Sequence, residues 1–372
     1  MPDLVTPPLH IEHGTCYALF AYDIGLAIHL EKAERHITAI TERGRIRHKA
    51  RAPQYFDYRP APLRLAQDGR ALEFGPYRSH PTVEVMLYDF GAVTVIYRIP
   101  LEGPFEGLLS LSQALYENDA LRSESRQRVE QLVRDIQPAV ERPMISAEVE
   151  DYLLFAIERC TPSEIHAVRA PYDALFARVL RSEATPLSDQ EVHEATSCRI
   201  AFGQGDLALI DWNAALVFGH DMDDVRAVLD FVNVELLEMR TLDQQLDRAL
   251  DEGYEALTRN PGRKLWLPGS HERAVTHIGQ LQVESAVLFE RVANTLKLLG
   301  DQYLARVYRL ASQRFHLDAW DASILRKLQT LDSIYSKMAD RATTQRMEYL
   351  EWIIIVLIAF SIVLPFLSPA GH

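Results

Sequence analysis

The stretch Thr82–Ile99, TVEVMLYDFGAVTVIYRI, places two runs rich in β-branched residues on either side of Gly91. Such runs predict strands, and the glycine between them predicts the turn of a β-hairpin. A similar arrangement follows in Ser197–Gly219, SCRIAFGQGDLALIDWNAALVFG, where apolar runs flank Gly203–Asp206. The chain is therefore predicted to build sheet structure from at least two hairpins.

Each hairpin is preceded by a short apolar strand and a helical stretch, and is followed by a longer helical stretch. The strands are CYALFAYD (Cys16–Asp23) and EDYLLFAI (Glu150–Ile157), and the helical stretches are 25–40, 105–136, 163–181 and 221–258. This order predicts an α+β fold with two strand–helix–hairpin–helix units, residues 1–140 and 141–262, as a possible internal duplication.

Beyond Asn260-Pro261-Gly262 the chain is predicted to be helical to its end. Apolar residues recur at three- and four-residue spacing over 275–299 and 324–338, which predicts an α-helical hairpin or coiled-coil stalk over 263–350. The same spacing is typical of helices that associate between chains, so a homo-oligomer through helices 273–345 is the alternative.

The C-terminal stretch WIIIVLIAFSIVLPFL (Trp352–Leu367) begins a run of 20 residues, 352–371, without an acidic, Lys or Arg side chain. Twenty apolar residues in a helix rise about 30 Å, the thickness of a hydrocarbon core. Residues 351–372 are therefore predicted to form one transmembrane helix, a tail anchor that contacts membrane lipid through Trp352, Ile353, Ile354, Ile355, Leu357, Phe360 and Leu364. Lys and Arg precede this stretch and none follows it, which predicts a single-pass protein of the inner membrane with the bulk of the chain cytoplasmic.

The composition excludes several classes of protein. The 372 residues carry a formal net charge of −13 and three cysteines without CxxC spacing, which excludes a disulfide scaffold and a zinc ribbon. Residues 1–100 hold 12 Lys and Arg against 11 Asp and Glu, whereas the remainder holds 27 against 41. No phosphate-binding loop, metal-ligand motif or nucleophile motif is present, so we predict neither a cofactor nor a metal.

A row of cations stands out in the near-neutral first hundred residues. In ERGRIRHKAR the basic residues alternate, which in a strand places them on one face, and aromatic residues follow closely. Such a face suits RNA, a ribosome or anionic lipid headgroups; the alternative is an exposed basic loop. The candidate binding residues are Arg43, Arg45, Arg47, Lys49, Arg51, Tyr55, Tyr58 and Arg59.

A row of acids follows in the predicted helix 221–258, where Asp243, Asp247, Asp251 and Glu255 are each four residues apart. On a helix they share one face. Clustered carboxylates are able to bind a divalent cation and support an enzyme, or to form a solvated or partner-docking face.

Several motifs resemble the RMND/Sif family (required for meiotic nuclear division), as a bacterial member. They are VMLYDFGAVTVIY, ALIDWNAALVF, VLDFVNVELLEMRTLDQQLD, GDQYLARVYRLASQRF and RMEYLEWIIIVLIAF. The resemblance implies a membrane-anchored protein, with mitochondrial members supporting translation, and no catalytic residues to carry over. With the acidic row it gives a partner-docking set of Glu235, Arg240, Asp243, Asp247 and Asp251.

The sequence thus leads to three hypotheses about function. The first is a non-catalytic, membrane-anchored scaffold or adaptor that presents a protein-docking surface to an unidentified partner. The second is a tethered RNA- or ribosome-binding protein that uses the basic row. The third is a metal-dependent enzyme that uses the acidic row over 243–255.

Overall fold

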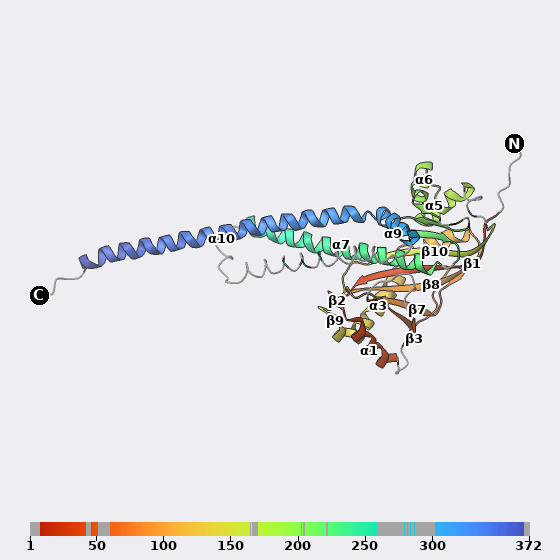
Figure 1. Cartoon of the computed structure of the whole chain (residues 1–372), viewed down its shortest axis with the longest axis horizontal. Helices are drawn as coiled ribbons and strands as arrows, with labels where there is room; N and C mark the ends of the chain where they lie inside the picture. Colours follow the sequence, from red (N-terminus) through yellow and green to blue (C-terminus); the bar gives the residue numbers. More distant parts are fainter. Residues whose placement is uncertain are drawn as a thin grey trace. The chain divides into compact units, whose positions relative to one another are not determined.

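Nine strands form one mixed sheet in the order β11-β12-β13-β10-β1-β8-β7-β4-β3 (Figure 1). The computed structural model describes residues 8–41, 46–50, 60–163, 165, 170–201, 203, 205–220, 222–258, 279, 281, 283, 286 and 302–367. The strands of this sheet are β1 (His10–Asp23), β3 (Ile46–Ala50), β4 (Leu63–Asp68), β7 (Thr82–Leu87), β8 (Ala92–Pro104), β10 (Glu150–Thr161), β11 (Arg199–Ile200), β12 (Leu207–Ile210) and β13 (Ala214–Phe218). The other strands of the described residues form two small ribbons, β2 (Ala27–Ile28) with β9 (Val140–Glu141) and β5 (Glu73–Phe74) with β6 (Tyr77–Arg78).

Strand β1 is the centre of the sheet. It pairs antiparallel with β10 on one side and with β8 on the other. All six residues from Ala18 to Asp23 are buried, which explains why this segment reads as a continuous apolar run rather than an alternating one. Both faces of the sheet are therefore covered by other elements.

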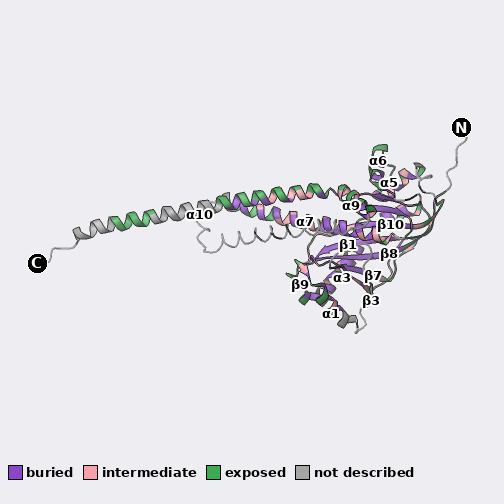
Figure 2. Cartoon of the chain, viewed as in Figure 1, coloured by how far each residue is buried: buried purple, intermediate pink, exposed green. Residues whose placement is uncertain are grey.

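One face packs against four helices, α1 (Leu30–Thr41), α2 (Gly107–Leu115), α3 (Asp119–Ile136) and α5 (Asp173–Arg181). The helix α6 (Asp189–Ser197) lies beside α5. The opposite face is covered by the first part of α7 (Asp223–Thr258) and by α9 (Gln302–Arg314), as Figure 2 shows by the buried residues between these layers. Residues 228–235 of α7 are all buried, because the sheet lies on one side of this helix and α9 on another.

The hairpin predicted around Gly91 is confirmed as β7 and β8, which pair antiparallel. Gly91 has a φ of +98°, and a Cβ at this position would lie 1.7 Å from the carbonyl oxygen of Gly25. The turn also accepts the backbone N–H of Ile24 at 2.9 Å. A glycine is thus required both by the backbone conformation and by the close approach of another loop.

The predicted α+β fold of two strand–helix–hairpin–helix units is wrong, because the strands of both predicted units join in a single mixed α/β sheet. The pairing also differs between the halves. β1 is antiparallel to β8, whereas β10 is parallel to β13. Similar orders of strands and helices along the chain therefore lead to different topologies, and the proposed duplication is not reproduced.

The chain divides into two compact units. One contains Met1–Thr241 and Leu288–Asp321, and the other contains Leu242–Val287 and Ala322–His372. The boundaries predicted after residues 140, 262 and 350 stay predictions.

The second unit pairs α7 with α10 (Leu317–Leu367). Lys327 Nζ of α10 lies 2.7 Å from an Asp243 carboxylate oxygen and 2.6 Å from one of Asp247. Further along, a Cβ on Gly253 would meet Ile334 at 3.1 Å. Because residue numbers rise together on both helices, α7 and α10 run parallel. The first arm of the predicted helical hairpin, 275–299, lies almost entirely outside the described residues, so the hairpin over 263–350 stays a prediction. Self-association through 273–345 stays a prediction.

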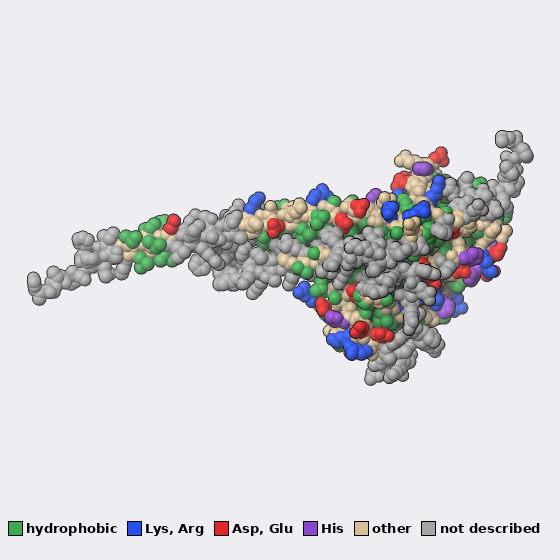
Figure 3. All heavy atoms as spheres, in the orientation of Figure 1, with side chains coloured by type: hydrophobic (Ala, Val, Ile, Leu, Met, Phe, Trp, Pro, Cys, Tyr) green, Lys and Arg blue, Asp and Glu red, His purple; other side chains and the backbone are tan. Residues whose placement is uncertain are grey.

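The predicted tail anchor is also contradicted. Among the residues that the structure describes, no helix is long and apolar enough to cross a membrane. The seven residues Trp352–Ile358 of α10 are each 53–66% exposed, and Figure 3 shows hydrophobic side chains gathered there. They rise about 10 Å, a third of a hydrocarbon core. The backbone of Phe360 and Leu364 is helical, and their side chains lie outside the description.

The consequences for the other membrane predictions follow from the same finding. The prediction of a single-pass inner-membrane protein with a cytoplasmic bulk rested on that transmembrane helix, and it is withdrawn with it. The anchor residues Trp352, Ile353, Ile354, Ile355 and Leu357 are placed on an exposed helical segment instead.

Candidate functional site

A tight turn, Asp211-Trp212-Asn213, connects β12 to β13. The Asp211 N–H donates to the carbonyl of Ala214 at 2.9 Å, and the Asp211 carboxylate accepts the N–H of Trp212 at 2.8 Å. Aspartate favours such turns because its short side chain accepts a nearby backbone N–H. Asp211 is completely buried, whereas Trp212 is 51% exposed. The turn thus places an exposed indole next to a buried aspartate side chain.

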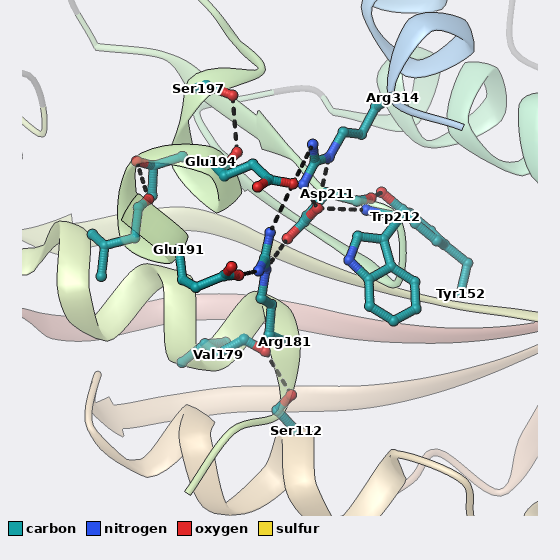
Figure 4. A network of polar contacts seen from close by, with 12 residues as sticks. Ser112, Tyr152, Val179, Arg181, Glu191, Glu194, Ser197, Asp211, Trp212 and Arg314 are labelled. Carbon is teal, nitrogen blue, oxygen red and sulfur yellow. Dashed lines mark hydrogen bonds and ion pairs between the residues drawn. The ribbon is translucent and has the colours of Figure 1, made fainter. Parts of the chain in front are cut away.

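Two arginines hold the Asp211 carboxylate from opposite sides (Figure 4). Arg181 Nε, in the last turn of α5, donates to Oδ2 at 3.0 Å, and Arg314 Nε, at the end of α9, donates to Oδ1 at 2.7 Å. Arg314 Nη2 donates to the same Oδ1. The two arginine side chains are only 13% and 11% exposed, so these charge-assisted hydrogen bonds lie largely away from water.

Helix α6 adds two further carboxylates to the network. Glu191 pairs with Arg181, and a carboxylate oxygen of Glu194 lies 3.6 Å from a guanidinium nitrogen of Arg181 and of Arg314. Ser188 caps the helix by accepting the N–H of Glu191 at 3.3 Å, which aims the first turn at the arginines. Three carboxylates face two guanidinium groups, so the cluster carries a formal charge of −1.

The backbone of the turn is fixed as firmly as its side chain. The Tyr152 hydroxyl donates to the Asp211 carbonyl at 3.0 Å, and the Leu153 N–H donates to the Asn213 carbonyl at 3.1 Å. Burial raises the pKa of Tyr152 well above its usual value, so the hydroxyl stays a neutral donor. The Tyr152 ring is packed edge-on against Phe315, with the ring centroids 5.3 Å apart.

This arrangement suits recognition better than bond-making chemistry. The Asp211 carboxylate has no exposed surface and accepts from two arginines and one backbone N–H, so a solvent-borne substrate does not reach it. The groups open to solvent are the indole of Trp212 and the side chains of Glu191 and Glu194, 42% and 51% exposed. These groups form what we call the Trp212 surface.

The basic row lies mostly outside the described residues. Of its members, Arg43, Arg45, Arg51, Tyr55, Tyr58 and Arg59 are not described. Arg47 and Lys49 belong to β3, at one edge of the sheet. The pairing of β3 with β4 shifts between Ile46 and His48, at Arg47 itself. Whether the row binds RNA or lipid stays a prediction.

The residues of the predicted docking set are distributed over four environments. Glu235 is buried and accepts from Tyr308, and Arg240 pairs with Glu150. Asp243 and Asp247 share Lys327.

Asp251 is exposed. In the described part of the chain, no group of three or more His, Cys, Asp or Glu side chains is arranged to hold a metal ion.

The sequence analysis missed the Asp211 network because its members are far apart in the chain. Arg181 and Arg314 are 30 and 103 residues away from Asp211. A local signal was nevertheless present. The aspartate and tryptophan interrupt the apolar run LALIDWNAALVFG, where a buried tight turn is expected.

Comparison with known proteins covers the sheet and the Asp211 turn. Residues 13–224 match the family described as "Uncharacterized protein MJ0711, N-terminal domain". The MJ0711 protein of Methanocaldococcus jannaschii is 21% identical over 193 residues, which are 51% of this chain and 58% of that protein. The chain thus matches less than two thirds of this relative's length. No solved structure matches.

The resemblance to the RMND/Sif family is overturned, since the family match and the relative both point to MJ0711. Three of the five motifs that suggested it begin at or after Val228, beyond the matched region. Those motifs carry apolar residues at helical spacing between charged ones, a pattern that many helices share. In the structure, the apolar residues at the start of the first motif are buried between the sheet and α9.

Proposed function

The chain belongs to the family of the MJ0711 N-terminal domain, and from the site built on this domain we propose that it is a non-catalytic adaptor that docks a protein partner on the Trp212 surface. The observation that carries the proposal is a half-exposed tryptophan on a backbone held by a buried ionic network. Tryptophan is enriched among the residues that dominate binding at protein interfaces.

Rigidity of the turn supports a docking role. Binding loses free energy when a loop must be ordered, and a turn already fixed by Asp211, Tyr152 and Leu153 avoids most of that loss. The indole is therefore presented in nearly one position before a partner arrives. Such an anchor needs only a shallow complementary hollow on the other protein.

The exposed carboxylates of the same network favour a basic partner. Glu191 and Glu194 are each partly exposed, and the network behind them is formally −1. A Lys or Arg of the partner is attracted to these carboxylates and to the face of the indole. The proposal is accordingly a partner surface that offers an apolar hollow beside at least one cation.

Site-specific photo-crosslinking in the cells that produce the full chain tests the proposal. A photoreactive amino acid replaces Trp212 in one variant and Met144, which is 58% exposed, in a matched control. We expect a discrete protein adduct from position 212 and none from position 144. The proposal fails if position 212 gives no adduct beyond the control.

A quantitative arm uses the crosslinked partner once it is isolated. Trp212→Ala should weaken its binding by about 30-fold or more, since a hot-spot residue contributes about 2 kcal/mol or more. Met144→Ala should leave the affinity unchanged. Equal affinities for the two variants would show that Trp212 is not the anchor.

The same experiment separates protein docking from RNA binding. An adduct that is removed by ribonuclease, and lost when Arg47 and Lys49 are both changed to Glu, would favour the RNA- or ribosome-binding alternative at the β3 edge. An adduct that resists ribonuclease and survives this charge reversal supports protein docking at Trp212.

A further inference from the structure

Helix α7 carries a buried carboxylate, Glu235, that no Lys or Arg side chain of the described residues pairs with. Glu235 is 2% exposed, and its Oε2 accepts from the Tyr308 hydroxyl of α9 at 2.8 Å. The charged groups that face it from α10 are Asp318 and Asp321, which have the same sign. A carboxylate in such a place is more stable with its proton than without it.

Another buried carboxylate of the same unit, Glu84, shows how neighbouring arginines offset the effect of burial on a pKa. Glu84 of β7 is as buried as Glu235, but Arg64 lies 2.6 Å and Arg226 3.1 Å from its two oxygens. These arginines hold the pKa of Glu84 below its usual value despite the opposing effect of burial. Glu235 has a hydroxyl in place of two guanidinium groups, and burial raises its pKa to about 8.

Helix α9 is held at two points six residues apart. Tyr308 contacts Glu235, and Arg314 contacts Asp211 beneath the Trp212 surface. The closed arrangement depends on the proton of Glu235. Ionisation places a buried charge near Asp318 and Asp321, and the Tyr308 hydrogen bond, which favours the ionised form, does not offset the cost of burial. A change at Glu235 is therefore passed along one 13-residue helix to Arg314.

We propose that Glu235, Tyr308 and the first turn of α10 form a proton-operated latch, which holds α9 against α7 when Glu235 is protonated and loosens α9 when the proton leaves. The sign follows from linkage. A carboxyl group whose pKa is higher in the closed state favours that state at low pH, and the advantage is lost as pH rises through the closed-state value. The latch thus operates across neutral pH and slightly above it.

Two other carboxylates at the α7 interface also have raised pKa values. Burial raises the pKa of Asp230 to about 6 and of Glu150 to about 7. Asp230 faces the sheet through Tyr88, and Glu150 belongs to β10 and pairs with Arg240, so neither contacts α9 in the described interactions. They provide controls on the same interface.

Amide hydrogen exchange of the full chain, followed for residues 302–314 from pH 6 to 9 and corrected for intrinsic rates, tests the latch. The protection of α9 should fall about tenfold between pH 7 and 9, as expected for one proton with a closed-state pKa near 8. Glu235→Gln keeps the shape and removes the titration, so its α9 protection should stay flat. A flat wild-type profile, or the same fall in Glu235→Gln, overturns the latch.

Two further variants keep the test independent of folding defects. Asp230→Asn should retain the wild-type fall in α9, because Asp230 accepts from Tyr88, which lies in the turn between β7 and β8. Tyr308→Phe removes the hydroxyl that stabilises the ionised carboxylate, so the fall should move to higher pH. A Tyr308→Phe profile identical to wild type would also count against the latch.

The consequence for docking rests on the proposed function. With the latch closed, Arg314 stays on Asp211, so crosslinking from position 212 should be stronger at pH 6.5 than at pH 8.5, and equal at both in a Glu235→Gln background. If α9 protection changes with pH but crosslinking does not, the regulation of docking is refuted and the latch stands. If position 212 never crosslinks, the proposed function fails, while the exchange result still decides the latch.

Discussion

Replacing Arg314 by methionine isolates the most distant member of the Asp211 network. Methionine keeps much of the apolar stem and removes both hydrogen bonds to the Asp211 carboxylate and the contact with Glu194 at 3.6 Å. Arg181 remains at 3.0 Å, so the buried carboxylate keeps one cation. The loss should lie below the 3–5 kcal/mol of an uncompensated buried charge, at about 2–3 kcal/mol.

The measurement is the urea unfolding curve of the sheet-containing unit, followed by amide exchange of β12 and β13. Arg306→Met serves as the matched control, because Arg306 is an exposed residue of the same helix. It should cost less than about 0.5 kcal/mol. In a double-mutant cycle, Arg314→Met combined with Asp211→Asn should cost less than the sum of the two single changes.

The reasoning is refuted by either of two results. If Arg314→Met and Arg306→Met destabilise the sheet equally, the contacts of Arg314 with Asp211 and Glu194 add nothing to the free energy of unfolding beyond what an exposed arginine contributes. If Arg314→Met and Asp211→Asn are additive, the two side chains do not interact energetically despite their 2.7 Å separation. Either result would also remove one of the reasons for regarding Trp212 as a fixed anchor, leaving the hydrogen bonds from Tyr152 and Leu153.

Three further outcomes are expected. Gly91→Ala should destabilise the sheet by more than about 2 kcal/mol in urea unfolding, because the new Cβ meets the Gly25 carbonyl and φ is positive; a neutral effect would contradict the turn geometry. The contribution of Glu84 to stability is present above its unfolded pKa and lost as pH falls through its lowered folded pKa, so Glu84→Gln should flatten the acid limb of the pH–stability curve. Lys327→Met should lower the free energy of unfolding by less than about 1 kcal/mol, since one of the two acidic partners of Lys327 on α7 is exposed. A larger loss would contradict the expectation that these ion pairs are weak.

The sequence predicted local elements well and their assembly poorly. The strand pair around Gly91 and the long helix from residue 221 are visible locally, because β-branched runs, turn glycines and helical spacing act within about ten residues. The joining of all nine strands into one sheet depends on β1 pairing with β8 and with β10, about 80 and 140 residues away. Periodicity does not report such pairings.

The candidate site was missed for a related reason. Like residues at regular spacing are visible in a sequence, as in the rows at 43–51 and 243–255. The network around Asp211 instead combines single arginines from α5 and α9 with acids from α6. Only the fold brings them together, whereas Asp243 and Asp247 of the regular row share a lysine and leave their face only partly available.

The boundary of the family match bears on how the site is completed. Asp211, Arg181 and both glutamates lie within residues 13–224, but Arg314 and Tyr308 lie beyond it. The matched region therefore provides a buried aspartate with one guanidinium, and α9 provides the second. Because α9 also contacts Glu235, the proposed latch makes the rigidity of the Trp212 turn depend on pH through α9, which lies outside the matched region. A relative that shares only the matched region should present this turn without that response, which a pH series of its amide exchange would reveal.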